Sequence, residues 1–299
     1  MTTAKGFARR TVLIGAAAGA ATLAAPMTLS GRAFAATAEE ANRKVNISGR
    51  QRMLTQRMSR AAVYAALGIE PERHIELLEV SRSDYAKALD GLNYGDADLG
   101  LPEEEFADIR DQIGVIEELW FPFESKVRRI VDRGEAKARE VDLIAETNVP
   151  LLKESNTLVE MLVKTYGGDV TDMGRAVALN IAGRQRMLSQ KMTKECGLIA
   201  YGYEREATTE ALGGTMTLFE NSLAALMQGN AMFTLPRPPE EVWTQLEVVR
   251  GLWGEFKPVV QTVAVAGSIN EAQLGFLAQN ADPLLANMHK AVNLYEVAA

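Results

Sequence analysis

Residues 46–60 read NISGRQRMLTQRMSR, and residues 180–194 read NIAGRQRMLSQKMTK. The differences between the two stretches are conservative, such as Ser for Ala or Arg for Lys. The likeness continues more weakly along the chain, since LWFPFESKV at Leu119 corresponds to LWGEFKPVV at Leu252. Because the offset stays nearly constant, the sequence indicates a tandem duplication of one unit of about 130 residues.

Each unit has the pattern of four helices. In the first unit, apolar residues recur every three to four positions, as on one face of a helix, over Val45–Leu67, Ile75–Leu92, Phe106–Val131 and Val141–Leu162. The second unit repeats the pattern with breaks near Gly202, at Gly229–Pro239 and at Gly267. No segment alternates as a strand would. We therefore predict an all-α fold of two tandem four-helix bundles, with units at residues 36–166 and 167–299.

Two local features refine this prediction. Ser268 and Glu271 have the spacing of a capping box and predict the start of the last helix. Pro150 and Pro283 fall at matching positions inside helical patterns, where each removes a backbone hydrogen bond. We expect each proline to kink or break its helix, either as a functional bend or as an inherited packing feature.

The first 35 residues have the pattern of an export signal. Arg9 and Arg10 precede an apolar run, and the sequence Ala-Phe-Ala ends at Ala35 in an A-x-A cleavage pattern. This segment resembles a twin-arginine signal peptide, cleaved near Ala35, and so predicts a periplasmic protein. Two alternatives are an ordinary secretory signal after a chance arginine pair and a retained membrane anchor. The Gly and Pro residues of the apolar run make it a poor spanning helix.

The charge balance excludes general attraction to polyanions. The formal net charge is -7, and residues 1–35 carry four basic residues and no carboxylate, so the expected mature chain is more acidic still. Such a chain is not drawn to nucleic acid or to an anionic bilayer surface. Any anion that it binds must be captured by a local basic patch.

The sequence offers no sign of a metal site or a cofactor. Cys196 is the single cysteine, stands among apolar neighbours and is expected to be a buried, inert thiol. His74 and His289 are the only histidines, and neither belongs to a cluster with ligand spacing. No haem, iron–sulfur or flavin motif is visible.

The repeated arginines allow two interpretations. Arginines on a helix usually form a solvated face or pair with nearby carboxylates. Alternatively, Arg52 and Arg186 each supply half of a clamp around a small planar anion, because a guanidinium matches planar oxyanions with donors in a fixed fork. Without the anion the two charges repel, so occupancy would change the distance between the helices. The fidelity of the two copies favours the clamp, although Gly49 and Gly183 could also be kept as close-packing points.

The repeated string resembles a known family signature. N-I-x-G-R-Q-R-M-L-[ST]-Q-[RK]-M is similar to the signature of the N-terminal domain of type IV pili methyl-accepting chemotaxis transducers, the PilJ type. That domain is similar to the four-helix periplasmic sensor domain of NarX-like nitrate and nitrite sensor kinases. The resemblance covers both units and implies a sensory domain in each.

In those nitrate sensors, the related helix contributes one arginine from each of two symmetric subunits, and the two arginines hold one nitrate. The resemblance assigns this role to Arg52 and Arg186 and a second basic position to Arg57 and Lys191. The candidate ligand-binding residues are therefore Arg52, Arg186, Arg57, Lys191, Arg50, Arg184, Gly49 and Gly183.

The sequence also departs from the sensors at two pairs of positions. Ile47 and Ile181 stand where the sensors can carry a lysine. Arg50 and Arg184 stand where the sensors have a small polar residue. These departures bear on which anion is bound.

Two functional hypotheses follow. In the first, an exported binding protein holds nitrate or nitrite within an internal pseudo-dimer and signals to a membrane-bound signalling or transport partner. In the second, a ligand-free helical module docks on a membrane receptor, a transporter or a pilus component. An enzyme is the weakest interpretation, because no nucleophile, base and oxyanion donors converge. The sequence leaves open whether the two units face each other or a second chain in a homodimer.

Overall fold

The computed structural model describes residues 37–167 and 173–297, and the expected export signal at residues 1–35 lies outside them. Within these ranges the chain forms eight long helices, one 3₁₀ turn at Ala231–Phe233 and no strand. The helices are α1 (Ala38–Ala66), α2 (Pro71–Tyr94), α3 (Ala107–Arg133), α4 (Ala138–Tyr166), α5 (Met173–Tyr201), α6 (Arg205–Gln228), α7 (Glu240–Ala266) and α8 (Glu271–Val297). The predicted all-α fold is confirmed.

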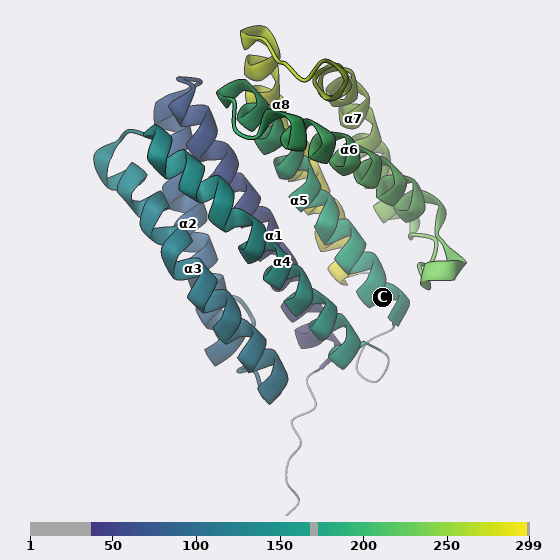
Figure 1. Cartoon of the computed structure of the whole chain (residues 1–299). Helices are drawn as coiled ribbons and strands as arrows, with labels where there is room; N and C mark the ends of the chain where they lie inside the picture. Colours follow the sequence, from purple (N-terminus) through teal and green to yellow (C-terminus); the bar gives the residue numbers. More distant parts are fainter. Residues whose placement is uncertain (1–36, 168–172, 298–299) are drawn as a thin grey trace, which may run out of the picture. The chain divides into compact units, whose positions relative to one another are not determined.

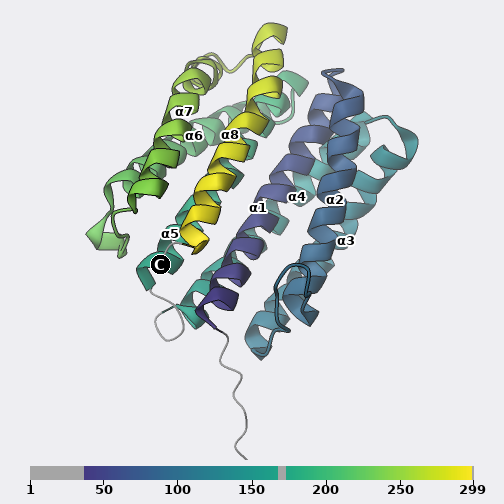
Figure 2. The same cartoon turned by 180° about the vertical axis from the view of Figure 1, so that it is seen from behind.

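The helices form two four-helix bundles. In the first, α1 packs on α2 and α4, and α3 closes the bundle between them; α5, α6, α8 and α7 repeat this arrangement in the second. The contact between α1 and α5 is the most extensive of any two helices. Figures 1 and 2 show α1 and α5 in the middle of the eight helices, with α2 and α3 on one side and α6 and α7 on the other. The two copies of the repeated string therefore face each other.

Equivalent residues build the two cores. Leu54 and Met58 are fully buried, as the helical pattern predicts. Tyr85 stacks on Trp120 with ring centroids 4.1 Å apart, and the matching pair Phe219 and Trp253 lies 4.6 Å apart. Aromatic pairs at such distances add to the free energy gained by burying their area. The duplicated sequence thus produces the same packing twice.

Helix α1 is buried on nearly all sides from Lys44 to Ala65, although it is rich in polar residues. A helix buried all round is normally apolar, because a buried polar group must find a hydrogen-bonding partner. The glutamines of the repeated string find such hydrogen-bonding partners in the neighbouring helix of their own bundle. Gln51 donates to the Tyr85 carbonyl of α2 at 2.9 Å, and Gln185 donates to the Phe219 carbonyl of α6 at 3.0 Å.

The two bundles approach closely near the C-terminal ends of α1 and α5. A methyl group added to Gly197 would lie 2.8 Å from Tyr64 Cε2 and 2.8 Å from Val63 Cγ1. No side chain fits at that distance, so glycine at this position sets the separation of the two helices. The spacing of the arginine-bearing segments depends on this contact.

Two local predictions are corrected. Helix α8 is capped by Asn270 and Gln273, whose side chains and backbone amides bond reciprocally at 2.9 and 3.0 Å, and the predicted box at Ser268 and Glu271 is wrong by two residues. Pro150 and Pro283 lie inside α4 and α8, which continue through them, so of the two expected outcomes, a kink or a break, the break does not occur. The loss of one backbone bond is tolerated because both helices are long and packed on their neighbours. None of the described helices combines the length and apolarity that a membrane-spanning segment requires.

Candidate anion site between α1 and α5

Two arginines meet at the interface of the bundles. Arg52 of α1 is 1% exposed and Arg186 of α5 is 0% exposed. A methyl group built on Gly49 would lie 3.4 Å from Arg52 Nη2 and 3.5 Å from Arg186 Nη2, and one built on Gly183 would lie at the same two distances. The guanidinium groups therefore converge on the small surface that the two glycines leave between the helices.

The hydrogen bonds of the two arginines cross between the bundles. Arg52 Nη2 donates to the Asn180 carbonyl of α5 at 3.3 Å, and Arg52 Nη1 donates to Asn156 Oδ1 of α4 at 3.2 Å. In the other copy, Arg186 Nη2 donates to the Asn46 carbonyl at 3.2 Å and to Asn46 Oδ1 at 2.8 Å. Each arginine is thus oriented by the asparagine that opens the repeated string of the other unit.

The fourth helix of each bundle supplies one more contact. Arg186 Nη1 lies 3.1 Å from His289 Nδ1 of α8, in the place where Arg52 meets Asn156 of α4. The arrangement is close to two-fold symmetric, but its two walls carry different side chains. The arginines match in position and in identity, whereas Asn156 and His289 match in position only.

No ion pair among the described residues joins a carboxylate to Arg52 or Arg186. Burial, followed by the charges of Arg184 and Arg186, lowers the pKa of Arg52 to about 9. Burial, followed by the charge of Arg50, lowers the pKa of Arg186 to about 9 as well. The Nε atom of each guanidinium is buried and has no hydrogen-bonding partner. Glu160 acts on Arg52 only through space and forms no ion pair with it. Two buried positive charges without a paired carboxylate raise the free energy of the folded protein, and an anion between them would offset that cost.

The carboxylate whose charge acts on Arg186 is already paired with other residues. Glu296 of α8 raises the pKa of Arg186 slightly against the lowering effect of burial. However, Glu296 Oε1 pairs with Arg43 Nε at 2.9 Å, and Glu296 Oε2 accepts a hydrogen bond from Asn46 Nδ2. This carboxylate therefore orients Asn46 and does not neutralise the arginine pair.

The structure places the second basic position away from the arginine pair. Arg57 Nη2 lies 3.8 Å from Asp282 Oδ1, and Lys191 Nζ donates to Thr215 Oγ1 at 2.7 Å and pairs with Glu195. Arg57 and Lys191 thus contact other residues and do not point toward Arg52 and Arg186.

Arg50 and Arg184 act on the site through space. Arg50 pairs with Asp84 at 2.5 Å, and its charge lowers the pKa of Arg186. The charge of Arg184 lowers the pKa of Arg52 in the same way. Of the eight predicted residues, four come together directly: Arg52, Arg186, Gly49 and Gly183. Arg50 and Arg184 add positive potential around them.

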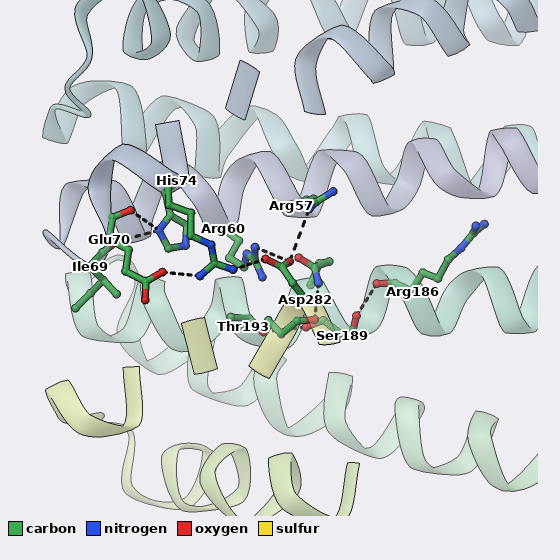
Figure 3. Close-up of polar contacts among 12 residues, drawn as sticks. Arg57, Arg60, Ile69, Glu70, His74, Arg186, Ser189, Thr193 and Asp282 are labelled. Carbon is green, nitrogen blue, oxygen red and sulfur yellow. Dashed lines mark hydrogen bonds and ion pairs between the residues drawn. The ribbon is translucent and has the colours of Figure 1, made fainter. Parts of the chain in front are cut away.

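A second cluster of arginines surrounds Asp282, the residue before Pro283. Arg60 Nη2 lies 3.0 Å from Asp282 Oδ1, Arg73 Nη2 lies 2.9 Å from Oδ2, and Figure 3 shows the contacts of Arg57 and Arg60 with the carboxylate. Although burial opposes ionisation, the Arg60 and Arg57 charges lower the pKa of Asp282. The first unit has Val149 at the matching position, so this cluster belongs to one side of the pseudo-dimer.

Two clefts lead from the surface toward the arginine pair. One, of about 270 Å³, lies between α1 and α8 and is lined by Arg50, Met53, Arg57, Asp282, Leu285 and His289, among others. Its counterpart between α4 and α5 has about 480 Å³, and Asn156, Lys191 and Lys194 line it. Because His289 and Asn156 each line a cleft and contact a buried arginine, each forms the wall between solvent and the arginine pair. A larger cleft of about 690 Å³ borders the loop 229–237, far from these residues in sequence, and has Arg237 as its single charged lining residue.

Sequence reasoning missed the residues that support the arginines. Asn46 and Asn180 were visible as the first letter of both repeated strings, and their identity in both copies was a usable signal. His289 and Asn156 differ from each other, so comparing the copies could not reveal them. Cys196 is buried, as expected, and burial raises the pKa of its thiol. Within the described ranges, no three His, Cys, Asp or Glu residues are placed to hold a metal ion.

Comparison with known proteins points to sensory receptors. The family described as type IV pili methyl-accepting chemotaxis transducer N-terminal domain, PilJ, matches residues 34–145 and 172–275, which is one match in each unit. The methyl-accepting chemotaxis protein McpN of Pseudomonas aeruginosa is 32% identical over 122 residues, covering 40% of this chain and 22% of that protein. The chain thus resembles about a fifth of the length of that relative.

Proposed function

Because the chain belongs to the family of type IV pili methyl-accepting chemotaxis transducer N-terminal domains, we propose that it is a sensory protein that holds one small planar oxyanion between Arg52 and Arg186. Nitrate and nitrite are the first candidates. The observation that carries the proposal is the pair of fully buried guanidinium groups with no carboxylate partner. The family is one of signal transducers and not of enzymes, and the proposal needs no chemical step.

The residues around the pair favour a small ligand. Each guanidinium already donates to carbonyl and amide oxygens, which fixes its plane. The facing glycines admit at most a small ligand beside the arginines, since even a methyl group on either would contact both Nη2 atoms. A planar anion with three or fewer oxygens can accept from two guanidinium forks at once. One such ion per chain is the expected stoichiometry.

Signalling follows from charge repulsion across the interface. In the empty protein the two arginines repel each other, and a bound anion replaces this repulsion with attraction to both helices. Helices α1 and α5 belong to different bundles, so the change acts on the relative position of the bundles. We propose that a membrane-bound signalling or transport partner reads this change, and that residues 1–35 export the chain to the periplasm.

A second candidate function is docking without a ligand. The loop between α6 and α7 exposes Met232 and Phe233 at 86% and 60% of their surfaces. Exposed apolar side chains of this size favour a contact with another protein. Partner capture that survives the loss of both buried arginines would support this candidate over anion sensing.

Isothermal titration calorimetry tests the proposal directly. The protein is titrated with nitrate, nitrite, chloride and sulfate at constant ionic strength, beside Arg52→Lys and Arg186→Lys. We expect saturable binding of one planar anion per chain and a loss of at least tenfold in affinity in each variant, because lysine keeps the charge but not the fork. Arg128→Lys, at a side chain that is 57% exposed, is the matched control and should bind like the wild type. Equal binding by all four proteins would refute the assignment of the site.

A further inference from the structure

The two walls of the anion site differ in one chemical property. Asn156 contacts Arg52 in the first unit, and His289 contacts Arg186 in the second. An asparagine amide does not change its charge with pH, whereas an imidazole gains a proton near neutrality unless its surroundings prevent it. The site therefore contains one group that can exchange a proton and one counterpart that cannot.

The contact with Arg186 determines the protonation state and the tautomer of His289. A guanidinium has donors only, so Arg186 Nη1 donates and His289 Nδ1 accepts at 3.1 Å. An accepting Nδ1 carries no proton, and the ring proton therefore resides on Nε2. His289 is neutral in this arrangement, and adding a proton to Nδ1 would break this hydrogen bond.

Positive groups face His289 from the helices around it. Arg186 lies on α5, Arg50 and Arg57 lie on α1 across the shared cleft, and the nearest carboxylate in that cleft is Asp282 on α8 itself. Asp282 is already held by Arg60 and Arg73. Burial, then the charges of Arg186 and Arg50, lowers the pKa of His289 to about 4. The empty site thus repels a proton for the same reason that it attracts an anion.

We propose, on the basis of the anion site inferred above, that His289 couples anion binding to the uptake of one proton from the cleft between α1 and α8. The anion offsets the charges that keep His289 neutral. The protonated ring then releases Arg186 Nη1, which becomes free to donate to the anion, and Nδ1 becomes a donor itself. His289 is thereby a positioning residue that makes the affinity of the site depend on pH.

The size of the coupling follows from simple electrostatics. A single negative charge about 5 Å from the ring, at an effective dielectric constant of about 20, raises the pKa of His289 by about two pH units. The bound form would then gain its proton near pH 6 and the empty form near pH 4. Thermodynamic linkage requires the anion to bind more tightly as the pH falls between these values. The expected gain is about tenfold from pH 7.5 to pH 5.

Calorimetric titration with nitrate from pH 5 to pH 8 tests the coupling, because nitrate itself stays ionised throughout. Wild-type protein should bind about tenfold more tightly at the acid end and should take up about one proton per anion, measured in buffers with different ionisation enthalpies. His289→Asn, which copies the wall that Asn156 forms, should bind nitrate with an affinity that no longer changes with pH. Binding that is equally tight at all pH values in the wild type would overturn the inference.

A spectroscopic measurement separates this inference from the proposed function. The chain has only two histidines, so an NMR titration of imidazole nitrogens resolves His289 once His289→Asn has identified its signal. Adding nitrate should raise the pKa of His289 by about two pH units and leave His74 unchanged. If nitrate binds through Arg186 but the signal of His289 does not move, the anion site stands and the coupling is wrong. If nitrate binds at no pH, both are wrong.

Discussion

Replacing Arg186 with methionine should stabilise the empty protein while it abolishes anion binding. Methionine has nearly the length of arginine and packs adaptably in an apolar or mixed environment, so Arg186→Met removes the charge with little change of volume. A buried charge without a partner is costly, and apolar replacement of such charges often stabilises a protein. The prediction separates a ligand site, which the empty protein maintains at a cost, from a structural contact.

The magnitude can be worked out from the surroundings of Arg186. Its pKa falls to about 9, more than three pH units below the ordinary value of arginine, and first of all because of burial. At about 1.4 kcal/mol per pH unit, keeping this side chain charged costs the folded empty protein about 5 kcal/mol. The three hydrogen bonds of Arg186, two to Asn46 and one to His289, return about 1 kcal/mol each. We therefore expect Arg186→Met to raise the free energy of unfolding by about 2 kcal/mol.

The effect has a defined pH dependence. A base whose pKa is lowered in the folded state destabilises that state at every pH below the lowered value, and the penalty shrinks as the pH rises through it. The gain from Arg186→Met should therefore be constant near neutral pH and should diminish above about pH 9. Urea unfolding at pH 7 and pH 9.5, in buffer free of nitrate, measures both values.

Thermal unfolding supplies the complementary test. The variant should melt about 5 °C higher than the wild type without nitrate, and only the wild type should gain stability when nitrate is added. Arg52→Met should behave in the same way, and Arg128→Met, at an exposed site, should change neither property. A melting temperature several degrees lower in Arg186→Met would mean that the hydrogen bonds outweigh the buried charge, and the argument for an anion site would lose its basis.

Three further predictions address the surroundings of the site. Gly49→Ala places a methyl group 3.4 and 3.5 Å from the two Nη2 atoms, an ordinary contact, so anion affinity should fall at least tenfold in calorimetry while the melting temperature stays within a few degrees of the wild type. Gly197→Ala brings a methyl group within 2.8 Å of α1, and urea unfolding should show a loss of about 1–3 kcal/mol. Asp282→Asn leaves the buried Arg60 without its carboxylate and should cost about 2–4 kcal/mol at pH 7. Because the charges of Arg60 and Arg57 lower the pKa of Asp282 against the effect of burial, its contribution is present at neutral pH and is lost as the pH falls through that lowered pKa, so the difference in stability between wild type and Asp282→Asn should shrink progressively on acidification.

The fold was predictable from periodicity and duplication, but the reason for the fidelity of the repeated string was only partly visible. The string is kept in both copies partly because Gln51 and Gln185 anchor α1 and α5 to their neighbours, a structural role that the sequence alone did not reveal. A clamp of Arg52 and Arg186 was one interpretation of the repeated string, and the sequence left open whether the two units face each other, as α1 and α5 do in the structure. The sequence alone could not show that Arg57 has a different role from Arg52 and Arg186. Its partner Asp282 lies more than two hundred residues away and has no equivalent in the first unit.

Tandem duplication within one chain explains how the two walls of the site came to differ. In a symmetric dimer every substitution occurs twice, so a histidine beside one buried arginine would also stand beside the other. A second protonatable ring next to the two buried arginines would add one more positive charge for a single small anion to offset. In this chain His289 faces Arg186 while Asn156 faces Arg52, and one proton and one anion can enter together. Reciprocal exchange tests this reasoning: Asn156→His alone should make nitrate affinity fall more steeply with rising pH, and Asn156→His combined with His289→Asn should restore the wild-type slope through the opposite cleft.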